Sequence, residues 1–134
     1  VPYKIYQSTV YISGQGPIKD NKVLYKGKIG KDLTLEDGIE AAKLCCLNIL
    51  AIIKQASNNW NNFYEIIKIG GFVNCVDNFE DHPKIINGAS DMLVKVLGKK
   101  GLHSRFAVGT NSLPLNIAVE IEAIVILNNE IENV

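Results

Sequence analysis

The stretch 119–127 limits the fold more than any other part of the chain. Hydrophobic residues occupy every second position, and two glutamates and two isoleucines stand between them. The first set is Val119, Ile121, Ala123, Val125 and Leu127, and the second is Glu120, Glu122, Ile124 and Ile126. A period of two is typical of a β-strand, whose successive side chains point to opposite faces of a sheet. The stretch therefore predicts a strand with one apolar face and one face that carries both carboxylates.

Two helices are expected between the strands. Hydrophobic residues recur at spacings of three and four from Leu35 to Ile53, directly after Thr34, whose hydroxyl can cap a helix. Pro83 suits the first turn of a second helix, which we expect to end near Leu97. The inner face of this second helix is expected to consist of Ile86, Leu93, Val96 and Leu97. Each helix thus has one side suited to packing against a sheet.

Strands are expected over 3–14, as two short strands, and over 22–28, 63–76, 104–109 and 117–127. Within 63–76, Gly70-Gly71 indicates a bulge or a close approach of another backbone. One face of this strand should carry Ile67, Ile69, Val73 and Cys75, and the other Tyr64, Ile66 and Phe72. The order β-β-β-α-β-α-β-β predicts an α+β fold with two helices packed on one face of a mixed sheet. The opposite face needs a cover, and a subunit interface is the candidate.

The composition indicates one domain over residues 1–134 and argues against nucleic acid as a partner. The chain has 134 residues, with 14 Lys and Arg against 14 Asp and Glu, whereas nucleic-acid-binding proteins usually carry a basic excess. The longest apolar runs, 49–53 and 123–127, are far too short to cross a membrane. We expect a cytoplasmic protein without a membrane partner. Because the sequence begins inside an expected strand and without an initiator methionine, we also expect an N-terminal segment to precede it.

Cys45, Cys46 and Cys75 are expected to be buried free thiols with a structural role. No Cys-x-x-Cys pair occurs. Adjacent cysteines in a helix point about 100° apart, which is unfavourable for a disulfide or a shared metal. Free cysteines are generally buried, and they stay reduced inside cells. We therefore expect no metal site.

Three charged residues are the main candidates for chemistry. Glu120 and Glu122 should lie about 7 Å apart on one side of the last strand, and a carboxylate on a largely apolar strand needs a charge partner or hydrogen bonds. Arg105 is the single arginine of the chain, and a guanidinium binds a carboxylate through two parallel hydrogen bonds that lysine cannot reproduce. The alternative for the glutamates is a structural ion pair with a lysine or with Arg105. The alternative for Arg105 is an ordinary surface position.

Weaker signals come from a turn, a helical asparagine and the two histidines. Ser13 and Gly14 stand in a run of turn residues that can approach a ligand or form an ordinary turn. Asn87 is a poor helix former, which is compatible with ligand binding or with a position facing water. His82 is expected to mark the start of the second helix rather than a metal site. His103 has no evident Ser or Cys partner in the sequence, so no nucleophilic triad is expected.

Six runs of residues form a pattern that extends over nearly the whole chain. They are Tyr11-Ile12-Ser13-Gly14-Gln15, residues 41–50, Gly71-Phe72-Val73-Asn74, Arg105-Phe106-Ala107-Val108, Leu113-Pro114 and Val119-Glu120-Ile121-Glu122-Ala123. The arginine, Leu-Pro and Glu-Ile-Glu-Ala elements are specific in combination. The pattern resembles the YjgF/RidA family, formerly described as an L-PSP endoribonuclease family. Residues 81–84 and 101–105 resemble a bacterial-type branch rather than the best-studied deaminase branch.

The resemblance implies a chorismate-mutase-like fold and a homotrimer with active sites in clefts between subunits. It implies hydrolysis of reactive enamine and imine intermediates of the 2-aminoacrylate type to 2-oxo acids and ammonia, with no metal and no organic cofactor. The partner would be a small carboxylate-bearing imine or 2-oxo acid. The family's substrate-binding arginine falls on Arg105, and its water-positioning glutamate falls on Glu120.

Further substrate-binding positions of the family fall on Ser13, Gly14 and Asn87. Ala107 stands where the family often has cysteine or serine, and a family tyrosine would lie just before Val1, where this chain has no residue. Both departures bear on the substrate range. Two other functions stay open: a non-catalytic ligand-binding or chaperone-like trimer, and an endoribonuclease, against which the neutral charge argues.

Overall fold

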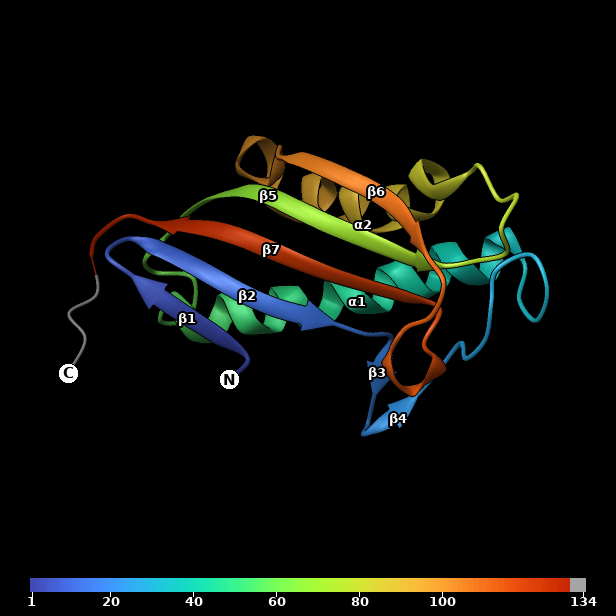
Figure 1. The fold of residues 1–134 in the computed structure, drawn as a ribbon. Coiled ribbons are helices and arrows are strands. Elements are labelled where there is room, and N and C mark those ends of the chain that lie inside the picture. Colours follow the sequence, from blue (N-terminus) through green and yellow to red (C-terminus); the bar gives the residue numbers. More distant parts are fainter. Residues whose placement is uncertain (131–134) are drawn as a thin grey trace.

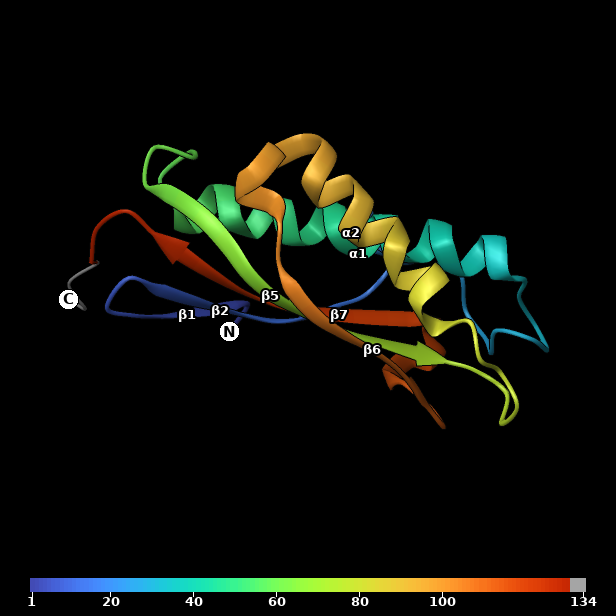
Figure 2. The same cartoon turned by 90° about the horizontal axis from the view of Figure 1, so that it is seen from above.

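The molecule consists of a five-stranded sheet with two helices against one of its faces (Figures 1 and 2). The computed structural model describes residues 1–130. The helices are α1 (Leu35–Ala56) and α2 (His82–Leu97), and the strand order of the sheet is β1-β2-β7-β5-β6. The strands are β1 (Tyr3–Tyr6), β2 (Thr9–Gln15), β5 (Phe63–Asn74), β6 (Ser104–Thr110) and β7 (Val119–Leu127). The predicted α+β fold, with two helices on one face of a mixed sheet, is confirmed.

The sheet is mixed because α2 carries the chain from β5 to a parallel neighbour. β5 and β6 are parallel, whereas the pairs β1–β2, β2–β7 and β5–β7 are antiparallel. A parallel pair requires a crossover connection, which α2 provides together with the 3-10 turn η1 (Gly98–Gly101). A second 3-10 turn, η2 (Pro114–Asn116), joins β6 to β7. β6 is therefore an edge strand, with α2 beside it.

The strand predicted over 22–28 is wrong beyond its first residues. β3 (Ile18–Lys19) pairs with β4 (Lys22–Val23) in a separate two-stranded sheet, and regular extended structure then ends. Tyr25 has a φ of 58° and Gly27 a φ of 125°, which both lie in the left-handed region and interrupt a strand. The apolar residues of this segment therefore belong to a loop.

α1 begins where the sequence predicts it. The Thr34 hydroxyl accepts a hydrogen bond from the backbone N–H of Asp37 at 3.1 Å, and the Asp37 carboxylate accepts one from the N–H of Thr34 at 2.9 Å. This capping box satisfies two N–H groups that would otherwise lack partners at a helix start. α2 begins at His82 with Pro83 in its first turn, as expected.

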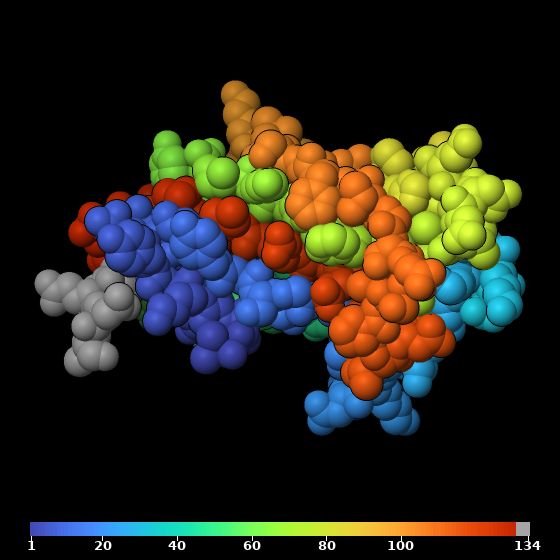
Figure 3. All heavy atoms as spheres, viewed as in Figure 1, coloured from blue at the N-terminus to red at the C-terminus, as the bar shows by residue number. Residues whose placement is uncertain are grey.

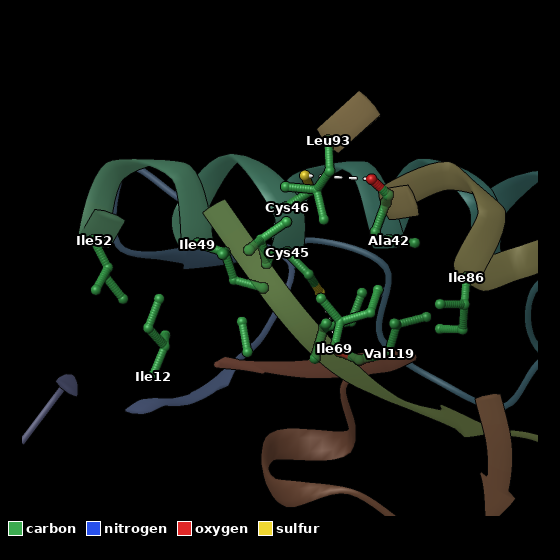
Figure 4. Packing of buried hydrophobic residues seen from close by; sticks show 14 of the residues in the cluster. Ile12, Ala42, Cys45, Cys46, Ile49, Ile52, Ile69, Ile86, Leu93 and Val119 are labelled. Carbon is green, nitrogen blue, oxygen red and sulfur yellow. Dashed lines mark hydrogen bonds between the residues drawn. The ribbon is translucent and has the colours of Figure 1, made fainter. Parts of the chain in front are cut away.

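The core lies between the helices and the covered face of the sheet (Figure 4). Cys45 and Cys46 are fully buried there, and the Cys46 thiol donates a hydrogen bond to the carbonyl oxygen of Ala89 at 3.6 Å, which links α1 to α2. Burial raises the pKa of the Cys46 thiol to about 12. Burial, and after it the neighbouring Cys46 and Glu120, raises the pKa of the Cys45 thiol. All three cysteines are free and buried, as predicted.

Two face assignments differ from the sequence prediction. The register of β5 against β7 shifts between Ile66 and Lys68, so the alternation changes phase there. Ile66 is consequently buried at 1% exposure, whereas Ile67 is 38% exposed. In α2, Val96 is 57% exposed and Ile85 is buried, because this helix packs against α1 as well as against the sheet. A spacing of buried residues that assumes one contact surface does not predict the buried positions of a helix that packs against both α1 and the sheet.

The face of the sheet opposite the helices has no covering layer within residues 1–130, and we call it the open face (Figure 3). Apolar side chains are exposed there, including Tyr6 at 62%, Tyr11 at 49% and Val108 at 43%. The rings of Phe72 and Phe106 pack edge to face beside them, with centroids 5.2 Å apart. Several exposed apolar side chains on one face of a sheet are typical of an interaction site. None of the helices among the described residues is long and apolar enough to span a bilayer.

The buried cysteines should react slowly while the protein is folded. A thiolate is the reactive form of cysteine, and a Cys46 pKa of about 12 leaves this thiol protonated at neutral pH. Iodoacetamide should therefore leave Cys45 and Cys46 unmodified in the native protein and modify all three cysteines after unfolding in guanidinium. Peptide mass analysis measures the sites. Rapid native labelling of Cys46 would contradict the packing of α1 against α2.

Candidate functional site

Arg105 lies near the start of β6, on the helix side of the sheet. The parallel register places it beside Ile69, which is fully buried under the helices. The Arg105 Nη1 donates a hydrogen bond to the Ser90 hydroxyl at 3.0 Å, and its Nη2 donates one to the carbonyl oxygen of Pro83 at 3.4 Å. The half-buried guanidinium therefore bridges the edge strand and α2, which excludes an unattached surface arginine.

Ser90 is itself part of a longer chain of hydrogen bonds. Its Oγ lies 2.9 Å from Nε2 of His103, and Nδ1 of His103 lies 2.6 Å from the carbonyl oxygen of Gly101. The expectation that His103 has no Ser partner is wrong, because α2 runs back along the start of β6 and brings Ser90 to it. The sequence separates these two residues by a helix end and η1, and no local pattern connects them.

Two further predicted positions lie close to Arg105. Ala107 follows on the same face of β6, where it pairs with Gly71. Asn87 stands four residues after Pro83 and three before Ser90, so it shares the side of α2 that contacts Arg105. Its side chain is exposed and also borders a hollow of about 420 Å³ between α1 and α2. Ala107 thus shares a strand face with Arg105, and Asn87 stands on α2 between the two residues that accept hydrogen bonds from the guanidinium.

Glu120 forms a second group with Gly14. The pairing of β2 with β7 shifts between Ile12 and Gln15, so Ser13 and Gly14 form a bulge opposite Glu122, and the side chain of Glu120 reaches Gly14 from two residues along β7. A Cβ atom at Gly14 would lie 2.8 Å from Cδ of Glu120, so only glycine lets the carboxylate lie against the β2 backbone. The Ser13 hydroxyl donates to the carbonyl oxygen of Val1 at 2.8 Å. The structure therefore brings Gly14 to Glu120 and places the Ser13 side chain against the N-terminal backbone.

The two groups do not meet within one chain. Glu120 pairs with Phe72 and lies on the open face, whereas Arg105 pairs with Ile69 and lies on the helix side. Their backbones are about 10 Å apart across two strand spacings and about 10 Å apart along the strands. The sequence predicts both groups, but it does not predict that the sheet separates them.

The ion-pair alternative for the glutamates finds no support within residues 1–130. Neither Glu120 nor Glu122 has a Lys or Arg nitrogen within 4.0 Å. Glu120 is half-buried, while Glu122 is exposed and lies beside Gly70, where a Cβ would come within 3.1 Å of Oε1. The Glu120 carboxylate is thus available for a ligand, a water molecule or a neighbouring subunit.

Cys75 and His82 form a further pair of side chains that no sequence pattern had indicated. The Cys75 Sγ lies 3.5 Å from Nε2 of His82, at a hollow of about 270 Å³ formed where β5 and β6 end. A Cβ at Gly109 would lie 2.6 Å from this Nε2, so the glycine makes room for the contact. Within the described residues, no cluster of three or more His, Cys, Asp or Glu side chains could hold a metal ion. His82 starts α2, as predicted.

Known proteins resemble this chain over almost its entire length. A family model described as "YjgF/chorismate mutase-like, putative endoribonuclease" matches residues 1–127. Protein TCP17 of Trypanosoma cruzi is 35% identical over 130 residues, which are 96% of this chain and 81% of TCP17.

Two solved structures are similar in both sequence and fold. A protein of unknown function from Agrobacterium tumefaciens has 42% identity and a TM-score of 0.93, over 96% of this chain and 82% of that one. A protein described as a "putative endoribonuclease" from Shewanella oneidensis MR-1 has 35% identity and a TM-score of 0.91, over 95% and 84%. With a family match over residues 1–127 and this shared fold, the chain belongs to the YjgF/RidA family.

Proposed function

We propose that this protein hydrolyses small carboxylate-bearing enamines and imines of the 2-aminoacrylate type to 2-oxo acids and ammonia. The observation that supports this most directly is the anchored guanidinium of Arg105. Two of its N–H groups are held by Ser90 and Pro83, and this fixes the plane of the group. A planar, fixed pair of donors matches a carboxylate, which accepts two parallel hydrogen bonds.

Glu120 would direct the attacking water. Its carboxylate lies against Gly14, without an ion-pair partner among residues 1–130. A carboxylate accepts a hydrogen bond from water and orients the water oxygen towards an electrophilic carbon. Positioning of this kind suffices for an imine, because the carbon is already reactive and the main requirement is alignment.

The chemical steps balance without a cofactor. The enamine gains a proton at carbon and loses one from nitrogen, which gives the imine. The oxygen of one water molecule then bonds to the imine carbon, a water proton passes to the imine nitrogen, and a carbinolamine forms. The hydroxyl proton of this intermediate moves to nitrogen, and ammonia leaves with formation of the 2-oxo acid. In this scheme Arg105 holds the carboxylate throughout, while Glu120 accepts the water proton and returns it to the nitrogen that leaves.

We propose that the working site forms between subunits of a homotrimer. Arg105 and Glu120 lie on opposite sides of the sheet, so one chain presents two half-sites. A rotational assembly that covers the open face can place the Glu120 half-site of one subunit against the Arg105 half-site of the next. The exposed Tyr11 and Val108 give this face the apolar character that such an interface requires.

RNA cleavage is the competing function, because relatives carry the description "putative endoribonuclease". The formal net charge of zero argues against it, since RNA binding relies on a basic surface. RNA cleavage that survives Arg105→Ala and repeated purification would support the nuclease. Ammonia release from freshly generated 2-aminoacrylate separates the deaminase from a trimer that only binds ligands.

Arg105 and Glu120 should fail in different ways when substituted. Arg105→Lys keeps the charge but loses the two-donor geometry, so 2-oxo acid binding and imine hydrolysis should both fall strongly. Glu120→Gln keeps the size of the side chain but loses the charge, so kcat should fall more than ligand affinity. Calorimetric titration with pyruvate and an ammonia-release assay measure the two effects. Normal binding and turnover by Arg105→Lys would disprove the carboxylate clamp.

Glu122→Gln is the matched control for Glu120→Gln. Glu122 lies on the same strand and the same face, but its carboxylate lies beside Gly70, whereas the carboxylate of Glu120 lies beside Gly14. We expect this variant to change the melting temperature more than the turnover. Loss of turnover in Glu122→Gln, with retention in Glu120→Gln, would mean that the two roles are reversed.

Mixing two inactive variants tests the assembly directly. Subunits with Arg105→Lys and subunits with Glu120→Gln, refolded together in equal amounts, should regain about one quarter of wild-type activity, since random trimers then contain intact sites at that frequency. Sedimentation should give a trimer for each sample. No regain of activity would place both residues in a site within one chain, and a stable monomer at micromolar concentration would exclude the assembly.

A further inference from the structure

The hydrogen bonds around Arg105 have a defined direction. The Gly101 carbonyl only accepts, so Nδ1 of His103 carries a proton and donates to it. The Arg105 Nη1 only donates, so the Ser90 oxygen accepts from it. The remaining Ser90 proton is then free to be donated to Nε2 of His103, 2.9 Å away. Each of the four groups is satisfied when the ring of His103 is neutral.

We infer that Ser90 and His103 are positioning residues that fix the Arg105 guanidinium for a planar carboxylate ligand. The inference rests on the proposed function, because it assigns the specificity of the same site. Ser90 holds Nη1, and the Pro83 carbonyl holds Nη2 at 3.4 Å. His103 in turn holds the Ser90 hydroxyl in the rotamer that accepts from Arg105. Neither residue needs to touch the ligand.

The Gly101 carbonyl, His103, Ser90 and Arg105 form a hydrogen-bonded relay, and its end at Gly101 is rigid. Gly101 is buried, and a Cβ atom there would overlap the carbonyl group of Leu93 in α2. The backbone that accepts from His103 is therefore packed against the same helix that carries Ser90. Both ends of the relay belong to one rigid unit, so the guanidinium is held with little freedom to rotate.

The anchoring still leaves a fork for the ligand. Each terminal nitrogen of the guanidinium has a second N–H, and Nε carries one more. With one N–H of Nη1 and one of Nη2 bonded to α2, three N–H groups of the guanidinium remain for a ligand, and the inference assigns the carboxylate to a parallel pair among them. Two parallel N–H groups match the two oxygens of a carboxylate. A rotating guanidinium would present this pair only part of the time, and the affinity for the carboxylate would fall in proportion to the fraction of molecules with the correct orientation.

The test is a mutant cycle on ligand binding. Ser90→Ala and His103→Ala should each weaken pyruvate binding by about ten- to hundredfold, the range expected for loss of a hydrogen bond that supports a charged group. Because the residues act through one relay, the double variant should bind no more weakly than the weaker single variant. In the ammonia-release assay, KM should rise more than kcat falls. Additive losses, or normal binding by either single variant, would overturn the inference.

Three further variants complete the design. Ser90→Thr keeps the hydroxyl and should bind pyruvate with near wild-type affinity. This result would show that the weak binding of Ser90→Ala comes from the lost hydroxyl rather than from misfolding. Weak binding by Ser90→Thr would overturn the inference. Among residues 1–130 the Ser104 hydroxyl bonds only the Ile67 carbonyl, at 3.3 Å, so Ser104→Ala is the control beside Arg105 and should bind pyruvate normally. If Arg105→Ala itself binds pyruvate normally, the proposed function and this inference both fail. If Arg105→Ala loses binding while the relay variants keep it, only the inference fails.

Discussion

The rest of the structure depends on β7, which is paired along both of its edges, with β2 on one side and β5 on the other. Its alternating sequence divides the molecule into a covered half and an open half. Val119 and Ile121 are fully buried under the helices, whereas Glu120 lies between them on the opposite face. A shift of one residue in this register would exchange the two sets and place carboxylates in the core. The burial of β7 therefore fixes where Glu120 can act.

The same division explains why a single chain carries only half-sites. β6 joins the sheet in parallel after α2, and this register turns Arg105 towards the helix side. There it finds hydrogen-bond acceptors on α2 that also hold its plane. Glu120 remains on the face where a bulge and Gly14 leave room for a carboxylate. In the proposed trimer, assembly brings the Arg105 half-site of one subunit to the Glu120 half-site of another, a contact that a single chain does not make.

The sequence predicted where the helices and strands lie better than it predicted the contacts between them. Period-two and helical patterns located β7, α1 and α2. Residue chemistry singled out Arg105 together with Glu120 and Glu122, and the resemblance to the family then selected Glu120. The phase change at Ile66 was not predictable, because a bulge depends on the partner strand. The relay from Ser90 to His103 was not predictable either, since it arises where α2 returns past β6. Such contacts depend on tertiary register, and local propensity carries no information about it.

The charges on the open face limit what the proposed interface can look like. Glu120 and Glu122 lie on a surface otherwise rich in exposed apolar side chains, such as Tyr11 and Val108. Covering a carboxylate with a purely apolar partner costs several kcal/mol, of the order found for unpaired buried charges (about 3–5 kcal/mol). An interface here must therefore leave Glu120 in contact with water or bring a cation close to it. In the proposed trimer, the Arg105 half-site of a neighbouring subunit would meet this requirement, because it provides a guanidinium. In the proposed trimer, one contact between Arg105 and Glu120 of neighbouring subunits would thus both neutralise the buried carboxylate and complete the catalytic site.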